Sequence, residues 1–105
     1  MAEESQYATE IASLHRMAGE SRLQAIESQL SLAVTLCAIA ETEIRYTRLD
    51  EAIKVLNKVR HHAETISIHV GEPDHVPWAA IPNLRKQLVQ LKKRIDEIEL
   101  RVRQR

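Results

Sequence analysis

The sequence predicts an all-α protein, an antiparallel helical bundle of three long helices plus a short N-terminal helix. Apolar residues recur at alternating spacings of three and four along most of the 105 residues, as they do on one face of a helix. The chain has no Phe, one Trp and two Tyr, so its core must consist of Leu, Ile, Val and Ala, which suits interdigitating helices. A chain of this length supports a single domain, residues 1–105, with a modest core.

The first half of the chain is expected to contain two helices, over residues 2–18 and 22–46. Gly19 suits the position just past a helix end, and Ser21 with Gln24 three residues later forms a capping box for the next helix. The helix over 22–46 carries two apolar rows, so it should be central or should meet a second subunit. The first row is Leu23, Ile26, Leu30, Ala33, Cys37, Ala40 and Ile44, and the second is Ala25, Leu32, Leu36 and Ile39.

A third helix is expected over residues 49–70. Thr47, with Asp50 three residues later, resembles an N-terminal cap. At the other end, Gly71 can take the left-handed conformation, and Pro73 cannot continue a helix. The apolar seam of this helix shows the same alternation of three and four: Leu49, Ala52, Leu56, Val59, Ala63, Ile66 and Val70.

A loop over 71–81 leads to Pro82, which suits a first helical turn, and a last helix is expected over 82–104. Residues 81–105 carry eight basic and three acidic side chains, a net charge of +5, whereas residues 1–48 and 49–80 carry −3 and −2. The last segment is therefore electrostatically complementary to the rest. Its apolar residues follow a strict heptad: Leu84, Leu88, Leu91, Ile95, Ile98 and Val102.

One further pattern spans a turn and its two flanking helices. It consists of Leu36, Ile39 and Ala40, then the turn, then Leu49, Ala52 and Leu56 within "RLDEAIKVL". Over residues 33–64 this pattern resembles a single tetratricopeptide repeat, a two-helix unit of about 34 residues. Thr47 stands where the turn glycine of that family is usual. The resemblance implies a tight helical hairpin and an adaptor that binds another protein.

Histidines crowd into the end of the third expected helix and the loop after it, with carboxylates beside them. Imidazole and carboxylate are suitable ligands for zinc, iron or copper. A metal-binding helical bundle is therefore one hypothesis, and the alternative is a group of solvated histidines near a helix C-terminus, where positive charge is favoured. The candidate ligands are His61, His62, His69, His75, Glu64 and Glu72.

Other function classes fit the residues less well. Catalysis is not expected, because glycine-rich loops are missing and Cys37 falls in an apolar seam, as a buried, reduced and inert thiol would. The basic residues of the last helix alternate with acidic ones and no aromatic is interleaved, which argues against nucleic acid. No apolar run approaches the length that crosses a bilayer. We therefore expect a cytoplasmic protein with no cofactor and with neither nucleic acid nor membrane as a partner.

The leading prediction is a non-enzymatic protein–protein interaction or scaffold module that self-associates through apolar helix faces. The seams and the second row are more apolar surface than so short a chain is expected to bury alone. The partner is then another copy, most simply in a dimer, or a different protein. The residues expected in the core or the interface are Leu32, Leu36, Ile39, Leu84, Leu88, Leu91, Ile95 and Ile98.

Overall fold

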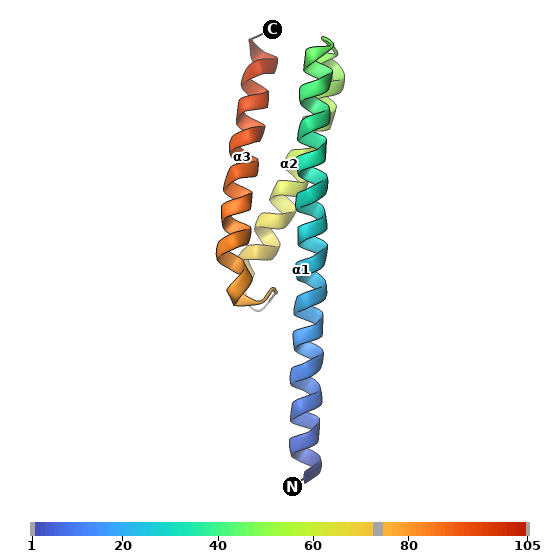
Figure 1. Cartoon of the computed structure of the whole chain (residues 1–105), viewed down its shortest axis with the longest axis vertical. Helices are drawn as coiled ribbons and strands as arrows, with labels where there is room; N and C mark the ends of the chain where they lie inside the picture. The colour runs from blue at the N-terminus through green and yellow to red at the C-terminus, as the bar shows by residue number, and fades with distance from the viewer. Residues whose placement is uncertain (1, 73–74, 105) are drawn as a thin grey trace.

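The computed structural model describes residues 2–72 and 75–104, without the side chains of residues 2–7 and 15. It contains three long helices, α1 (Ala2–Arg45), α2 (Leu49–Gly71) and α3 (Ile81–Arg103), and a short 3-10 helix, η1 (Trp78–Ala80), directly before α3. The described residues include no strand, so the all-α prediction is confirmed. The chain reverses direction after α1 and again before η1 (Figure 1), and each long helix packs against the other two.

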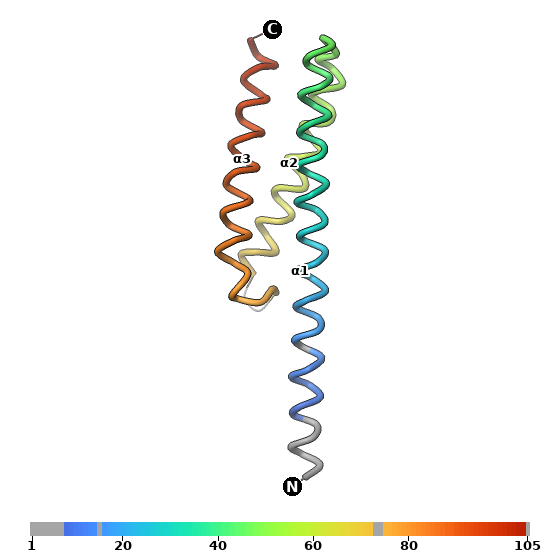
Figure 2. Tube along the Cα trace, in the orientation of Figure 1, coloured from blue at the N-terminus to red at the C-terminus, as the bar shows by residue number. Residues whose placement is uncertain are grey.

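Helix α1 is much longer than its neighbours. It has 44 residues, against 23 in each of α2 and α3, and its N-terminal part, coloured blue, extends beyond both of them (Figure 2). None of the described side chains before Gly19 is buried. The molecule is consequently elongated, measuring 70 × 19 × 15 Å along its principal axes.

The predicted break at Gly19 is wrong, because α1 runs through this residue. A single glycine costs a helix only about 1 kcal/mol relative to alanine, and interrupting the helix would leave several backbone groups without partners. Gly19 is buried, and a Cβ atom placed there would lie 3.7 Å from Pro77 Cδ. Four separate helices are therefore not formed, and Ser21 and Gln24 lie inside α1 rather than at a cap.

The core lies where the three helices meet, and each helix contributes the seam that its spacing predicts. Burial of such side chains is the main favourable contribution to folding, at about 25 cal/mol for each Å² removed from water. Val76, in the loop before η1, closes one end. The buried residues are Ile26, Leu30, Ala33, Cys37, Ala40, Ile44, Ala52, Leu56, Val59, Ala63, Ile66, Val70, Val76, Leu84, Leu88, Leu91, Ile95 and Ile98.

The turn between α1 and α2 ends α1 with a left-handed residue. Thr47 has φ of 60°, and its N–H donates to the carbonyl of Ile44 at 2.9 Å, while the N–H of Arg48 donates to Glu43 at 2.8 Å. This pair of bonds is the Schellman arrangement that commonly carries glycine at the left-handed position. Thr47 is therefore not the side-chain cap predicted for α2: the capping residue is Arg48, and it makes no side-chain cap bond.

Helix α2 ends without a left-handed glycine, contrary to the expectation for Gly71, since neither glycine has positive φ. The residue after it, Glu72, is extended, with φ of −81° and ψ of 131°. A residue that precedes proline is pushed toward this region, and Pro73 follows Glu72 in the sequence. At the start of α3, Pro82 occupies the first turn, where its missing N–H has no cost.

Candidate functional site

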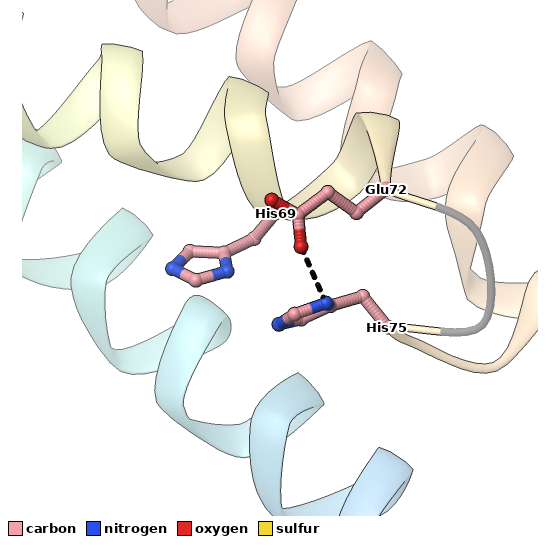
Figure 3. A group of neighbouring side chains, drawn as sticks. All are labelled: His69, Glu72 and His75. Atoms are coloured by element: carbon pink, nitrogen blue, oxygen red, sulfur yellow. Dashed lines mark ion pairs between the residues drawn. The ribbon is translucent and has the colours of Figure 1, made fainter.

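Three side chains with metal-binding atoms converge at the C-terminal end of α2. His69 lies in the last turn of α2, Glu72 directly follows the helix, and His75 belongs to the loop before η1 (Figure 3). One ligand atom from each residue can be chosen so that all three lie within 4.8 Å of one another. The Nδ1 atom of His75 is 2.6 Å from Glu72 Oε2, and the two imidazole centroids are 5.0 Å apart.

Helix α1 packs next to this group of three side chains. The Nε atom of Arg22 donates a hydrogen bond to the backbone carbonyl of His75 at 2.6 Å, and this bond ties the loop to α1. His69 lines a small cavity together with Ala25, Ile26, Gln29 and Arg22 of α1. The group therefore lies in a defined corner between α1, the end of α2 and the following loop. His69 and His75 are both half-buried, while Glu72 is exposed.

The structure separates the six predicted metal ligands into two sets. The rings of His61 and His62 lie next to each other, with centroids 6.2 Å apart, about two turns before His69 on α2. Glu64 lines a groove between α2 and α3. Among the described residues, His69, Glu72 and His75 form the one group with metal-ligand geometry, so His61, His62 and Glu64 are not part of it.

The predicted interface residues also fall into two sets. The five from α3 face the core of the single chain, since they are buried against α1 and α2. They are therefore not available to a second chain. Of the three predicted on α1, Leu36 is half-buried and packs against the core, whereas Leu32 and Ile39 keep 46% and 42% of their surface exposed. These five core residues of α3 are Leu84, Leu88, Leu91, Ile95 and Ile98.

An uncovered row of apolar side chains follows α1 from Ile11 to Ile39. It consists of residues spaced seven apart, and all of them are exposed. The sequence pattern showed only the later part of this row, because the expected break at Gly19 hid its continuation toward the N-terminus. Leu14 and Met17, both more than half exposed, flank its early part. The members of the uncovered row are Ile11, Ala18, Ala25, Leu32 and Ile39.

The two apolar sides of α1 give it the overall hydropathy of a membrane span. The segment Ala8–Arg45 contains an 18-residue window that is long and apolar enough to cross a bilayer by length and composition. Only 28% of that window is buried inside the structure, so the core seam leaves most of it uncovered. This finding departs from the expectation that no segment reaches such a length. Because a core helix passes the same test, the finding does not distinguish a membrane from another protein chain as the partner.

The cysteine and the tryptophan of the chain lie in opposite surroundings. Cys37 is fully buried and unpaired, as predicted. Burial raises the pKa of its thiol, and the opposing effect of the Arg94 charge is smaller, so the thiol stays protonated at neutral pH. Trp78 does not cover the end of the helices, because 83% of its surface is exposed. It lines a surface cavity with Gly19, Pro77 and other residues of that end.

Comparison with protein-family models finds no match, and comparisons with curated proteins and with solved structures likewise find none. The resemblance of residues 33–64 to a tetratricopeptide repeat therefore stays a prediction. Two features are candidates for function: three metal-binding side chains at one end of α2, and an apolar row on α1 that the other described residues leave exposed.

Proposed function

We propose that this protein is a non-enzymatic self-association module, an antiparallel three-helix bundle that pairs with a second copy through the uncovered row of α1. The observation that carries the proposal is the row itself. Ile11, Leu32 and Ile39 expose between 42% and 54% of their surface on one line along the helix. Exposed apolar side chains aligned on one face of a helix are typical of a protein-interaction site.

The spacing of the row favours another helix as the partner. A row of apolar residues spaced seven apart fills one of the two apolar positions of a coiled-coil heptad, and it stays against a second helix when the two wind with a small left-handed supercoil, since two turns of a helix take 7.2 residues. A flat or irregular partner surface would place no such demand on the spacing. The row covers four successive intervals of seven, from Ile11 to Ile39.

The sizes of the side chains favour a two-fold, antiparallel pair. Ala18 and Ala25 are small and permit two backbones to approach closely, whereas Ile11, Leu32 and Ile39 are large. When two copies run in opposite directions about Ala25, Ile11 faces Ile39 of the other copy and Ala18 faces Leu32. Large side chains then lie opposite small ones near the centre. Such a contact uses the same patch on both subunits, as closed dimers do.

Substitutions on the row test the proposal. Size-exclusion chromatography with light scattering at micromolar concentration should give wild-type protein twice the mass of one chain. Leu32→Glu combined with Ile39→Glu should give a single-chain mass, because each dimer would bury four unpaired carboxylates. Circular dichroism should show unchanged helix content, because both positions are exposed in the single chain. Wild-type protein that stays monomeric would contradict the proposal.

A matched control separates the row from exposed apolar surface in general. Val89 and Leu100 of α3 are exposed by 66% and 56%, more than Leu32 and Ile39, and they lie outside the row. The double variant Val89→Glu with Leu100→Glu should therefore remain dimeric. Loss of the dimer in both double variants would show that the contact is not specific to α1.

The direction of pairing can be tested separately with engineered cysteines. A chain with Ile11→Cys is mixed with a chain with Ile39→Cys under mild oxidation. Antiparallel pairing predicts a mixed disulfide between the two variants, whereas parallel, in-register pairing predicts a disulfide within each variant alone. Cys37 is buried and does not compete for these disulfides.

The two alternative partners give different results in further experiments. If the row docks on a membrane, the wild-type protein should float with lipid vesicles and the Leu32→Glu, Ile39→Glu variant should not. If it docks on a different protein, as the tetratricopeptide resemblance implies, wild-type protein should be monomeric and should not float. Either result would replace self-association as the function of the row.

A further inference from the structure

We propose that His69, Glu72 and His75 bind one divalent transition-metal ion, with zinc the best match. Two imidazoles and one carboxylate are a donor set that zinc uses when it keeps a fourth position open. The three residues come from the last turn of α2, the residue that caps it and the loop beyond (Figure 3). All three ligands come from one chain, so this proposal does not depend on the proposed self-association through α1.

The distances are close to those that a metal requires. Ligand atoms around a tetrahedral zinc ion are about 3.3 Å apart, given metal–ligand bonds of about 2.0–2.1 Å. The three ligand atoms lie within 4.8 Å of one another, and the Nδ1 atom of His75 forms an ion pair with Glu72 Oε2 at 2.6 Å. The widest spacing must therefore shrink by about 1.5 Å at most, and the ion pair between His75 and Glu72 must open by about 0.7 Å. Rotation of the side chains supplies both changes, because Glu72 is exposed and has three rotatable bonds.

The surroundings hold His75 in position. Arg22 donates to the carbonyl of His75, so the loop is fixed to α1 before any ion arrives. The buried side chain of Val76 anchors the next residue in the core. Prearranged ligands raise affinity, because less conformational freedom is lost on binding. The positive charge of Arg22 opposes this effect, and it sets the affinity below that of an otherwise identical site without a nearby cation.

Metal binding would join three consecutive parts of the chain. The ion would connect the end of α2 to the loop that follows it, across the point where the helix hydrogen bonds stop. A ligand that binds only the folded state raises stability in proportion to the logarithm of its concentration above Kd. The fourth coordination position would hold a water molecule or a group from another molecule.

The chain provides its own control for a test. His61 and His62 are also adjacent imidazoles on α2, but they belong to no group with metal-ligand geometry among the described residues. The double variant His61→Ala with His62→Ala therefore removes the same number of histidines as His69→Ala with His75→Ala. It does so without touching the proposed site.

The experiment is a zinc titration of untagged protein, monitored by competition with a chromogenic chelator and by thermal melting. The proposal expects one zinc per chain, a melting temperature that rises with zinc, and unchanged behaviour in the His61→Ala, His62→Ala control. The His69→Ala, His75→Ala variant should bind at least about tenfold more weakly, since loss even of an outer partner has that effect. Circular dichroism without metal checks that each variant is folded.

Cobalt provides a second readout that does not depend on stability. A Co²⁺ ion in the proposed three-ligand site should give the intense visible absorption of a four-coordinate complex, and Glu72→Gln should weaken it. Absence of stoichiometric zinc binding in the folded wild-type protein would overturn the proposal. So would equal zinc affinity in the two double-histidine variants, since that result would place the ion elsewhere.

Discussion

Arg94 of α3 and Glu41 of α1 form an ion pair, with 2.8 Å between Arg94 Nε and Glu41 Oε1. The two residues are 53 positions apart in the sequence, so the pair exists only in the folded chain. It lies near Cys37: burial has the largest effect on the pKa of that thiol, while the charge of Arg94 lowers that pKa and the charge of Glu41 raises it. Arg94 also borders the groove between α1 and α3, which Leu30, Val34 and Gln87 line with it. The pair thus connects α1 to α3 beside that groove.

A double-mutant cycle should detect this ion pair. Arg94→Gln, Glu41→Gln and the double variant are compared by urea denaturation at low salt. Both side chains are about one-third exposed, at 34% and 30%, so we expect a coupling free energy of about 0.5–1 kcal/mol, in the range of surface pairs. The coupling should shrink at high salt, because exposed charges are screened. Additive single effects at low salt would show that the pair does not stabilise the fold.

Thr47→Gly should stabilise the protein. A β-branched residue at φ of 60° is strained by roughly 1–2 kcal/mol, which glycine relieves at some cost from its more flexible unfolded chain. The expected gain is about 1 kcal/mol in the free energy of unfolding, measured by urea or thermal denaturation. Thr42→Gly, within α1, is the control and should be destabilising. A loss of stability in Thr47→Gly would show that this turn is not strained.

Glu99 should make the stability of the protein sensitive to acid. The pKa of Glu99 lies below its ordinary value of 4.5, chiefly because Arg60 donates a hydrogen bond to it from 2.5 Å. As the pH falls below about 4.5, the unfolded carboxyl takes up a proton before the folded one does. The stabilisation is therefore complete above that pH and is lost as the pH falls through the lowered pKa.

Melting temperatures measured from about pH 7 down to about pH 3, a range in which carboxyl groups take up protons, test whether the stabilisation from Glu99 is lost in acid. Glu99→Gln should lower the melting temperature at neutral pH, and the difference from wild type should narrow in acid. Glu97→Gln, an exposed neighbour on α3, is the control for a generic carboxylate. A difference that stays constant over the whole pH range would contradict the role assigned to Arg60.

Cys37 should react with thiol reagents only when the protein opens. Its side chain is fully buried, and burial raises the pKa of the thiol more than the Arg94 charge lowers it. Both effects deprive an alkylating reagent of an accessible thiolate. Iodoacetamide labelling followed by mass spectrometry should be far slower in buffer than in denaturing urea. Labelling at equal rates in the two conditions would show that this part of α1 is open.

The core could be predicted from the sequence, because burial on a helix follows a simple period. Ile26, Leu56 and Leu88 lie in separate seams, and the three-four alternation alone predicts that they face inward. The break at Gly19 was predicted wrongly because glycine has only a weak local preference. In α1 that preference is outweighed by the continuity of the helix on both sides.

The candidate metal site could not be predicted from the periodicity of the sequence in the same way. All six possible ligands were visible as residue types, but the spacing of His69 and His75 on a helix and a loop says nothing about their distance in space. That distance depends on how Glu72 turns the chain and on the bond from Arg22 to the carbonyl of His75. The extent of the uncovered row was missed for a related reason, since Ile11 and Ala18 join it only when α1 is continuous.

The overhang of α1 would make the protein a molecular spacer. Paired about Ala25, residues 2–18 of each copy would lie along residues 32–48 of the other, so each arm would reach the hairpin of its neighbour. A seven-residue insertion ahead of Gly19 would shift the opposing arms by about 10.5 Å while leaving the packed end of each chain unaltered. An insertion of two residues would instead turn Ile11 by about 200° around the helix axis, because each residue turns an α-helix by about 100°, and would move it to the opposite face from its partner. The N-terminal arm of α1 would therefore keep its pairing when its length changes by seven residues at a time, about two helical turns.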